Sequence, residues 1–201
     1  MLDKQGTVLA AIMGAALLFF GGLQYFFLMI VFLLLAVIAT KHQHAAKREM
    51  GIYEHERGWE NVLYNGIVPT VAAVANPLIG PMPFICSIAA ITSDKFASEL
   101  GVLSGNPISL ETLKPVKPGT SGAVSVFGFL MSLAGAMLLG VSAIIIFNVT
   151  PNQAFLIGLA GFFGSLVDSI VGILEEKGIG TKGTTNLICS IAGALAGLLI
   201  H

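Results

Sequence analysis

Apolar runs separated by polar segments repeat along the whole chain. Two runs open it, at 7–20 and 25–40, with the interruption Gly21-Gly22-Leu23-Gln24 between them. Five more follow, at 61–74, 81–91, 123–147, 153–174 and 184–200. A membrane-spanning helix needs roughly 20 apolar residues, so the pattern predicts about seven spans, the third and fourth of them short. The first two runs together predict a tight helical hairpin.

The composition supports a membrane protein. The mean hydropathy is +0.89, and 55% of the residues are hydrophobic while only 10% are charged. A soluble domain carries about 25% charged residues. We therefore expect an all-α, polytopic transmembrane helical bundle that lies in the bilayer. A net charge of −1 argues against a nucleic-acid partner. Two cysteines, both in apolar runs, are too few for a cysteine-rich metal site.

The charges sort the polar segments into two groups. Every Lys and Arg lies in 1–6, 41–60, 93–120 or 175–182, and so does every Asp and Glu except Asp168. With seven spans these four segments share one side, and the excess of Lys and Arg marks that side as cytoplasmic. The predicted topology has the N-terminus inside and the C-terminus outside. It is one transmembrane domain, with a hairpin (1–40), a cytoplasmic loop (41–60) and a five-helix catalytic core (61–201) that contains a second cytoplasmic loop (93–120).

Three carboxylates near the cytoplasmic side are candidate metal ligands: Asp94, Glu99 and Asp168. Mg²⁺ takes one or two protein carboxylates together with phosphate oxygens, and ionisable groups at membrane depth are usually functional. Ser98 follows Asp94 by four residues and shares its helical face, whereas Glu99 points away from it. The alternative is that Asp94 only ends a helix at the membrane interface.

A Lys/Gly-rich loop is a candidate phosphate-binding segment. Its glycine turn precedes an apolar run, and backbone N–H groups at such a turn can bind phosphate. Basic residues before other helices could pair with phosphate as well. We expect nucleotide binding by Lys114, Lys117, Gly119, Thr120, Ser121, Gly122, Lys182 and Asn186. Substrate binding is expected from Arg57, Asn61, Asn65 and Ser98, although each Asn could simply cap a helix. The sequence has no P-loop and no protein-kinase signature.

Two helix starts in the chain are similar to each other. Arg57-Gly58-Trp59-Glu60-Asn61 and Lys182-Gly183-Thr184-Thr185-Asn186 each consist of a basic residue, Gly, two further residues and Asn. Membrane proteins often contain internal repeats, so an internal repeat is one interpretation and chance is the other.

An ordered set of motifs resembles a known family. It comprises Arg57-Gly-Trp-x-Asn61-Val-Leu-x-Asn65-Gly, Ser93-Asp94-x-Phe-Ala-Ser-Glu99-Leu-Gly101, Lys117-x-Gly119-Thr120-x-Gly122, Gly164-Ser-Leu-x-Asp168-Ser and Asn186-Leu. The set is similar to the integral-membrane family of the plant phytyl-phosphate kinase, and distantly to the CTP-dependent dolichol and phytol kinases. The resemblance implies functional roles for Asp94, Glu99, Lys117, Gly119, Thr120, Asp168 and Asn186. Lys95 departs from the pattern, since a small or hydroxyl residue is commoner there.

These observations favour a Mg²⁺-dependent lipid kinase. It would transfer a phosphoryl group from a nucleotide, CTP by resemblance, to an isoprenyl monophosphate, with Asp94, Lys117 and Asp168 as catalytic residues. Three alternatives stay open: a cytidylyltransferase acting on a lipid phosphate, a membrane transporter and a structural membrane protein. The sequence leaves the chain length of the lipid, the nucleotide and homo-oligomer formation open.

Overall fold

A computed structural model of the chain describes residues 3–43, 48–49 and 58–200. The first helix, α1 (Lys4–Ala16), ends in a π turn, η1 (Leu17–Gly21). The further helices are α2 (Leu23–Lys41), α4 (Trp59–Val74), α5 (Asn76–Ile79), α6 (Met82–Leu100) with the 3₁₀ turn η2 (Gly101–Ser104), α7 (Val126–Phe147), α8 (Pro151–Glu176) and α9 (Lys182–Gly197). Two short strands, β1 (Ile108–Ser109) and β2 (Ala123–Val124), lie between η2 and α7. The predicted all-α transmembrane class is confirmed.

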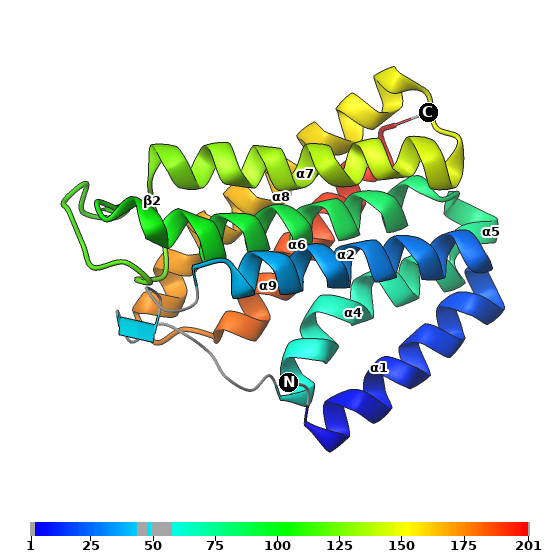
Figure 1. Cartoon of the computed structure of the whole chain (residues 1–201), viewed down its shortest axis with the longest axis horizontal. Coiled ribbons are helices and arrows are strands. Elements are labelled where there is room, and N and C mark those ends of the chain that lie inside the picture. Colours follow the sequence, from blue (N-terminus) through cyan, green and yellow to red (C-terminus); the bar gives the residue numbers. More distant parts are fainter. Residues whose placement is uncertain (1–2, 44–47, 50–57, 201) are drawn as a thin grey trace.

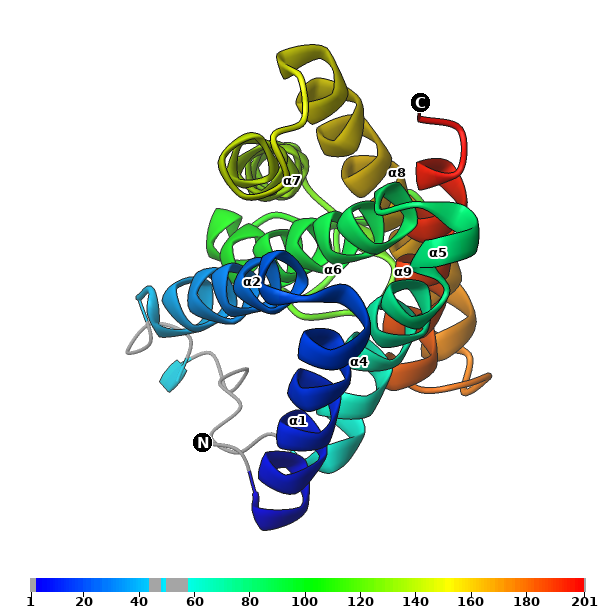
Figure 2. The same ribbon diagram turned by 90° about the vertical axis from the view of Figure 1, so that its right-hand side faces the viewer.

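Helix α6 is the central helix of the bundle (Figures 1 and 2). It packs against α7, α8 and α9, and also against α2 and α4. Every residue from Pro83 to Asp94 is buried, which explains why this segment reads as a continuous apolar run. Close packing depends on small residues of the neighbouring helices. A Cβ atom on Gly161 would lie 2.8 Å from the backbone of Ala89, and one on Gly193 would lie 2.6 Å from the carbonyl oxygen of Cys86.

Four of the described helical segments are long and apolar enough to cross a membrane. They are Lys4–Gly21, Leu23–Lys41, Val126–Phe147 and Pro151–Glu176. Helices α4 and α9 have 16 residues each, and the last turns of α6 are charged. Helix α6 continues past the predicted run, through Leu100. Asp94 therefore lies inside a helix and does not end it.

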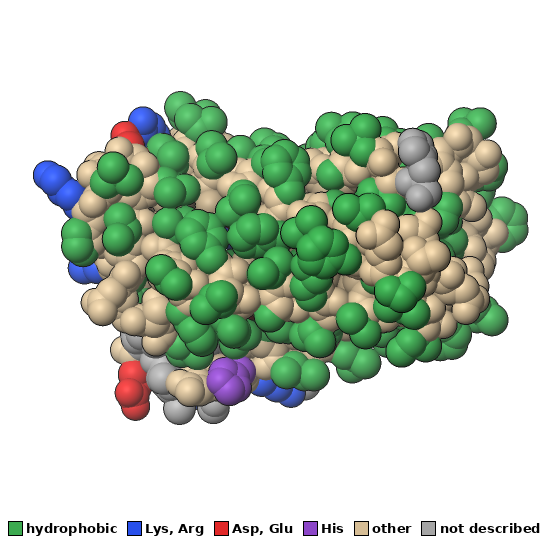
Figure 3. Space-filling view, turned by 90° about the horizontal axis from the view of Figure 1, so that it is seen from above, with side chains coloured by type: hydrophobic (Ala, Val, Ile, Leu, Met, Phe, Trp, Pro, Cys, Tyr) green, Lys and Arg blue, Asp and Glu red, His purple; other side chains and the backbone are tan. Residues whose placement is uncertain are grey.

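Charged side chains gather at one end of the bundle (Figure 3). The helix ends that meet there include the C-terminal ends of α2, α6 and α8 and the N-terminal ends of α4, α7 and α9. At the same end, β1 and β2 pair in antiparallel register, with Ile108 opposite Val124 and Ser109 opposite Ala123. The hairpin folds the long loop back over the helix ends. At the other end, the α7–α8 turn is uncharged and closes with a capping box between Thr150 and Gln153.

Candidate functional site

A cavity of about 520 Å³ opens at the charged end. It lies between α6, α7, α8 and α9, with the loop before α7 over it and α4 at its edge. Its lining contains most of the residues that the sequence singled out: Asn61, Asp94, Ser98, Glu99, Gly119, Thr120, Ser121, Gly122, Asp168, Lys182 and Asn186. Segments that are distant in the sequence thus meet in one place.

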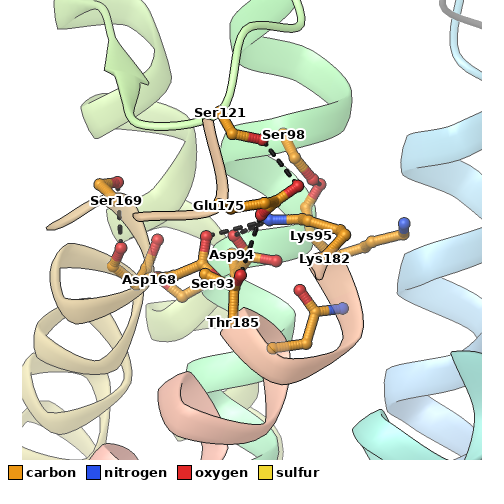
Figure 4. Close-up of polar contacts among 12 residues, drawn as sticks. Ser93, Asp94, Lys95, Ser98, Ser121, Asp168, Ser169, Glu175, Lys182 and Thr185 are labelled. Atoms are coloured by element: carbon orange, nitrogen blue, oxygen red, sulfur yellow. Dashed lines mark hydrogen bonds and ion pairs between the residues drawn. The ribbon is translucent and has the colours of Figure 1, made fainter. Parts of the chain in front are cut away.

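An ammonium group lies between two buried carboxylates in this cavity (Figure 4). Lys182 Nζ is 3.0 Å from Asp168 Oδ2 and 3.9 Å from Asp94 Oδ1. The two Asp residues are 5% and 7% exposed, whereas the Lys182 side chain is 48% exposed. Thr181 caps α9 and its side chain accepts from the backbone N–H of Thr184, which fixes Lys182 as the first residue of the helix.

Two buried oxygens of the cavity lack a hydrogen-bond partner among the described residues: Asp168 Oδ1 and Asn186 Oδ1. The amide of Asn186 donates instead toward Asn65 Oδ1, at 3.4 Å, and Asn65 Nδ2 donates to the carbonyl oxygen of Asn61 at 2.8 Å. A buried polar atom without a partner costs about 1–3 kcal/mol. These two oxygens are therefore suited to a ligand that brings a donor or a cation.

The cavity carries excess negative charge. Its charged lining residues are four carboxylates and two amines, a formal sum of −2: Asp94, Glu99, Asp168, Glu175, Lys95 and Lys182. Oxygen donors with negative charge are the ligands that Mg²⁺ prefers, so the residues fit such an ion. Within the described ranges, no group of three or more Asp, Glu, His or Cys side chains is close enough to hold a metal.

Glu99 lies on a different side of α6 from the Asp pair. Its Oε1 is 3.1 Å from Lys95 Nζ and accepts a hydrogen bond from Thr40 Oγ1 of α2 at 2.9 Å. Ser98 lines the cavity, and its hydroxyl donates to the carbonyl oxygen of Lys95 at 3.3 Å. Glu99 thus connects α6 with α2.

The glycine turn rests on α8. Gly119 and Gly122 have φ of +90° and +71°, which favours glycine. A Cβ atom on Gly172 would lie 2.6 Å from the backbone N of Gly122, so the turn touches the helix directly. Strand β2 and the N-cap Ser125 separate the turn from α7. The glycine turn thus lies three residues before α7, and the side chain of Ser125 accepts from the backbone N–H of Gly128 at that helix start.

Glu175 holds this turn and was missed by the sequence reasoning. Its Oε1 accepts from Ser121 Oγ at 2.8 Å and its Oε2 accepts from Thr185 Oγ1 at 2.9 Å (Figure 4). It lies in the last turn of α8, within a segment that the sequence marked only as a polar loop. No motif in the sequence singles it out.

A chain of three serine hydroxyls, to which the sequence analysis gave no role, includes two residues of the cavity lining, Ser132 and Ser165. Ser93 Oγ and Ser132 Oγ are 2.8 Å apart, and Ser132 Oγ donates to Ser165 Oγ at 2.9 Å. The chain joins α6, α7 and α8 just beside Asp94 and Asp168. Ser165 precedes Asp168 by three residues and shares its helical face, a spacing that could have identified it.

Among the described residues, three of the predicted ones are not in the lining: Lys114, Lys117 and Asn65. Lys114 and Lys117 are exposed on the loop, and Thr120 Oγ1 donates to the carbonyl oxygen of Lys117 at 2.9 Å. Arg57 lies outside the described residues. Asn65 is in contact with the lining through Asn186 rather than part of it.

Comparisons with known proteins identify the family. A family model described as "Integral membrane protein DUF92" matches residues 1–190. An uncharacterized membrane protein of Methanocaldococcus jannaschii is 39% identical over 100% of this chain and 86% of its own. Two Arabidopsis thaliana proteins also match: Protein PGR (32% identical; 65% of this chain, 59% of its own) and chloroplastic Protein VTE6 (28%; 58% and 35%). No solved structure matches the chain. The chain belongs to the integral membrane protein family DUF92, which confirms the family that its ordered motifs resemble.

Proposed function

We propose that this protein is a membrane lipid kinase that transfers a phosphoryl group from a nucleotide to an isoprenyl monophosphate. The observation that carries the proposal is the buried Asp94–Asp168 pair, with an unpartnered oxygen, in a cavity at the charged end of a membrane bundle. A soluble nucleotide and the phosphate of a membrane lipid can meet only near such an end. CTP as the donor and the isoprenyl acceptor rest on the family resemblance.

The negative charge of the cavity determines what must accompany the phosphates. An anionic nucleotide and an anionic lipid phosphate would be repelled by a lining with a formal charge of −2. Mg²⁺, held by Asp94 and Asp168, would neutralise charge on the phosphate oxygens. The two Asp side chains are buried and lie on the long helices α6 and α8, which fix the direction of their oxygens.

The chain's own residues position the two substrates. A phosphate monoester is already anionic near neutral pH, so phosphoryl transfer to it needs orientation and charge neutralisation more than a strong base. We propose that backbone N–H groups of the turn 119–122 bind nucleotide phosphates, with Lys114 and Lys117 at the rim. Lys182 pairs with a phosphate, and Asn61, Asn65, Asn186 and Ser98 contact the substrates from α4, α9 and α6.

We further propose that the charged end faces the cytoplasm, because every Lys and Arg of the sequence belongs to a segment on that side in a seven-span topology. Single cysteines at Lys117 and Asn152, in a chain without its two native cysteines, test this orientation. A membrane-impermeant thiol reagent should label position 117 only from the cytoplasmic side and position 152 only from the other. Labelling of both from one side would refute the topology.

An assay with purified protein tests the reaction. The mixture contains Mg²⁺, CTP or ATP labelled at either the α or the γ phosphate, and a panel of prenyl alcohols and prenyl monophosphates. A kinase transfers the γ label to a prenyl monophosphate and gives the diphosphate. Transfer of the α label would identify a cytidylyltransferase instead. No transfer of either label to any lipid, with protein that is folded and monodisperse, would contradict the proposal.

A further inference from the structure

The Lys182 side chain occupies the position between two carboxylates where a divalent cation would bind. We propose that the ammonium group of Lys182 pairs with Asp94 and Asp168 when no metal is bound, and that a divalent cation displaces it from this position. The released ammonium group then faces the phosphates of the substrate. The displacement stands on geometry alone, whereas its second half, the move to phosphate, rests on the proposed function.

Lys182 only partly satisfies the two carboxylates that a divalent cation would bind. Its Nζ makes a hydrogen bond of 3.0 Å to Asp168 Oδ2, but the 3.9 Å to Asp94 Oδ1 is too long for one. One positive charge faces two carboxylates, and a third carboxylate, Glu175, lines the same cavity. The cluster therefore keeps a negative surplus that a divalent cation would remove.

Unsatisfied oxygens point to the same ligand. Asp168 Oδ1 is buried without a partner among the described residues, although Lys182 is bound to the other oxygen of the same carboxylate. Asn186 Oδ1, in a side chain that is 8% exposed, is also without one. Carboxylate and amide oxygens are hard ligands for Mg²⁺ and Mn²⁺. Lys182 leaves both oxygens without a partner, whereas a divalent cation in the same cavity could take them as ligands.

The three charged residues differ in freedom of movement. Asp94 and Asp168 are buried on α6 and α8, but Lys182 begins α9 and almost half of its side chain is exposed. Its four-carbon stem can swing the ammonium group toward solvent or into the cavity without a movement of the helix. Displacement is therefore compatible with a rigid bundle.

Lys182→Met tests the displacement. We expect Mn²⁺, measured by electron paramagnetic resonance in detergent with neither nucleotide nor lipid, to bind roughly five- to tenfold more tightly than to the parent, because no ion pair has to break first. Lys177→Met is the matched control: Lys177 Nζ also pairs with a carboxylate, Glu111, at 2.8 Å, but neither residue lines the cavity. The control should bind Mn²⁺ as the parent does.

The second half predicts an effect of opposite sign. Pyrophosphate, added as the Mn²⁺ complex, should bind several-fold more weakly to Lys182→Met than to the parent, because the phosphate loses a charged partner. A lysine with only a structural role would not strengthen metal binding and weaken phosphate binding at once. Unchanged or weaker Mn²⁺ binding by a folded Lys182→Met would overturn the displacement.

A measurement on the parent protein covers the case in which the variant does not fold. Mg²⁺ should raise the rate at which an amine-reactive acetylating reagent modifies Lys182 by severalfold, and should leave the rate at Lys177 unchanged, as read by mass spectrometry. Equal rates at Lys182 with and without Mg²⁺ would overturn the proposal. Both the metal and the labelling experiments omit the lipid, so tight metal binding without phosphoryl transfer would refute the lipid-kinase function and leave the displacement standing.

Discussion

The last turns of α6 carry two carboxylates in different surroundings. Glu99 pairs with Lys95 one turn away on the same helix, at 3.1 Å, and accepts a further hydrogen bond from Thr40. Asp94 faces Lys182 across the cavity, at 3.9 Å, and shares it with Asp168, whose Oδ1 has no partner among the described residues. A charged residue near the charged end of the bundle is therefore not, by itself, enough to indicate function. A better indicator of function is a buried charged side chain that has an oxygen without a hydrogen-bond partner, as in Asp168.

The energetics point the same way. An ion pair between residues four apart on a helix, such as Lys95 and Glu99, contributes about 0.3–0.5 kcal/mol to stability. This contribution is modest. Burying the two Asp carboxylates removes them from water, and a buried ion pair often fails to recover that cost. Stability alone does not account for two buried Asp carboxylates in this cavity, whereas the proposed binding of a cation would account for them.

The largest expected effect follows from removing a charge of the Asp pair. Asp94→Asn and Asp168→Asn should each lower phosphoryl transfer at least ~100-fold, the order found when one charge-stabilising group is removed from an active site. Thermal stability should stay the same or rise, because an amide is cheaper to bury than a carboxylate. Turnover and melting temperature of both variants check this. If both variants unfold, the pair is a structural ion-pair cluster and the catalytic role is refuted.

An intermediate effect is expected from the contact between the turn and α8. Gly172→Ala places a methyl group against the backbone of Gly122, which must move. We expect a loss of about 1–3 kcal/mol in stability from overpacking and a rise of the KM for the nucleotide with a smaller change in kcat. Gly14→Ala on α1 is the control, since its new methyl group would meet only the ring of Phe26, at 3.4 Å. An unchanged nucleotide KM in Gly172→Ala would remove the turn from the binding site.

The smallest effect is expected on the other side of α6. Glu99→Gln removes a charge but keeps an oxygen that can accept the Thr40 hydrogen bond. We expect a change in turnover of less than about threefold and a loss of stability no larger than ~1 kcal/mol, as for a partly exposed ion pair. Steady-state kinetics beside Asp94→Asn provide the measurement. A loss as large as in the Asp variants would place Glu99 among the metal ligands and erase the distinction between the two sides.

Much of the fold was predictable because the membrane imposes a strong constraint on the sequence. Most of each predicted apolar run is helical in the structure, and the charges gather at one end as their distribution indicated. Hydropathy alone ends this run at Ile91, whereas α6 continues through Leu100, as the shared helical face of Asp94 and Ser98 indicated. Helix α4 packs on α9, and Asn186 Nδ2 donates toward Oδ1 of Asn65, one turn after Asn61.

The candidate site was predicted in part. Residue type and motif order identified Asp94, Asp168, Lys182 and the glycine turn, all of which line the cavity. The exposure of Lys117 and the hydrogen bond from Ser121 to Glu175 depend on how the loop that contains β1 and β2 folds back. Such a long-range arrangement leaves no local pattern in the sequence, so neither could be read from it.

The ratio of two rates tests the central claim most directly. The γ-phosphoryl transfer to a prenyl monophosphate is measured in Glu99→Gln and in Asp168→Asn, at equal concentrations of folded protein and saturating Mg²⁺. The proposed site predicts that the Glu99 variant is faster by at least ~30-fold, from a threefold loss against a hundredfold one. Equal rates in the two variants would contradict it, because the buried, incompletely paired carboxylates would then be no more important than the paired one.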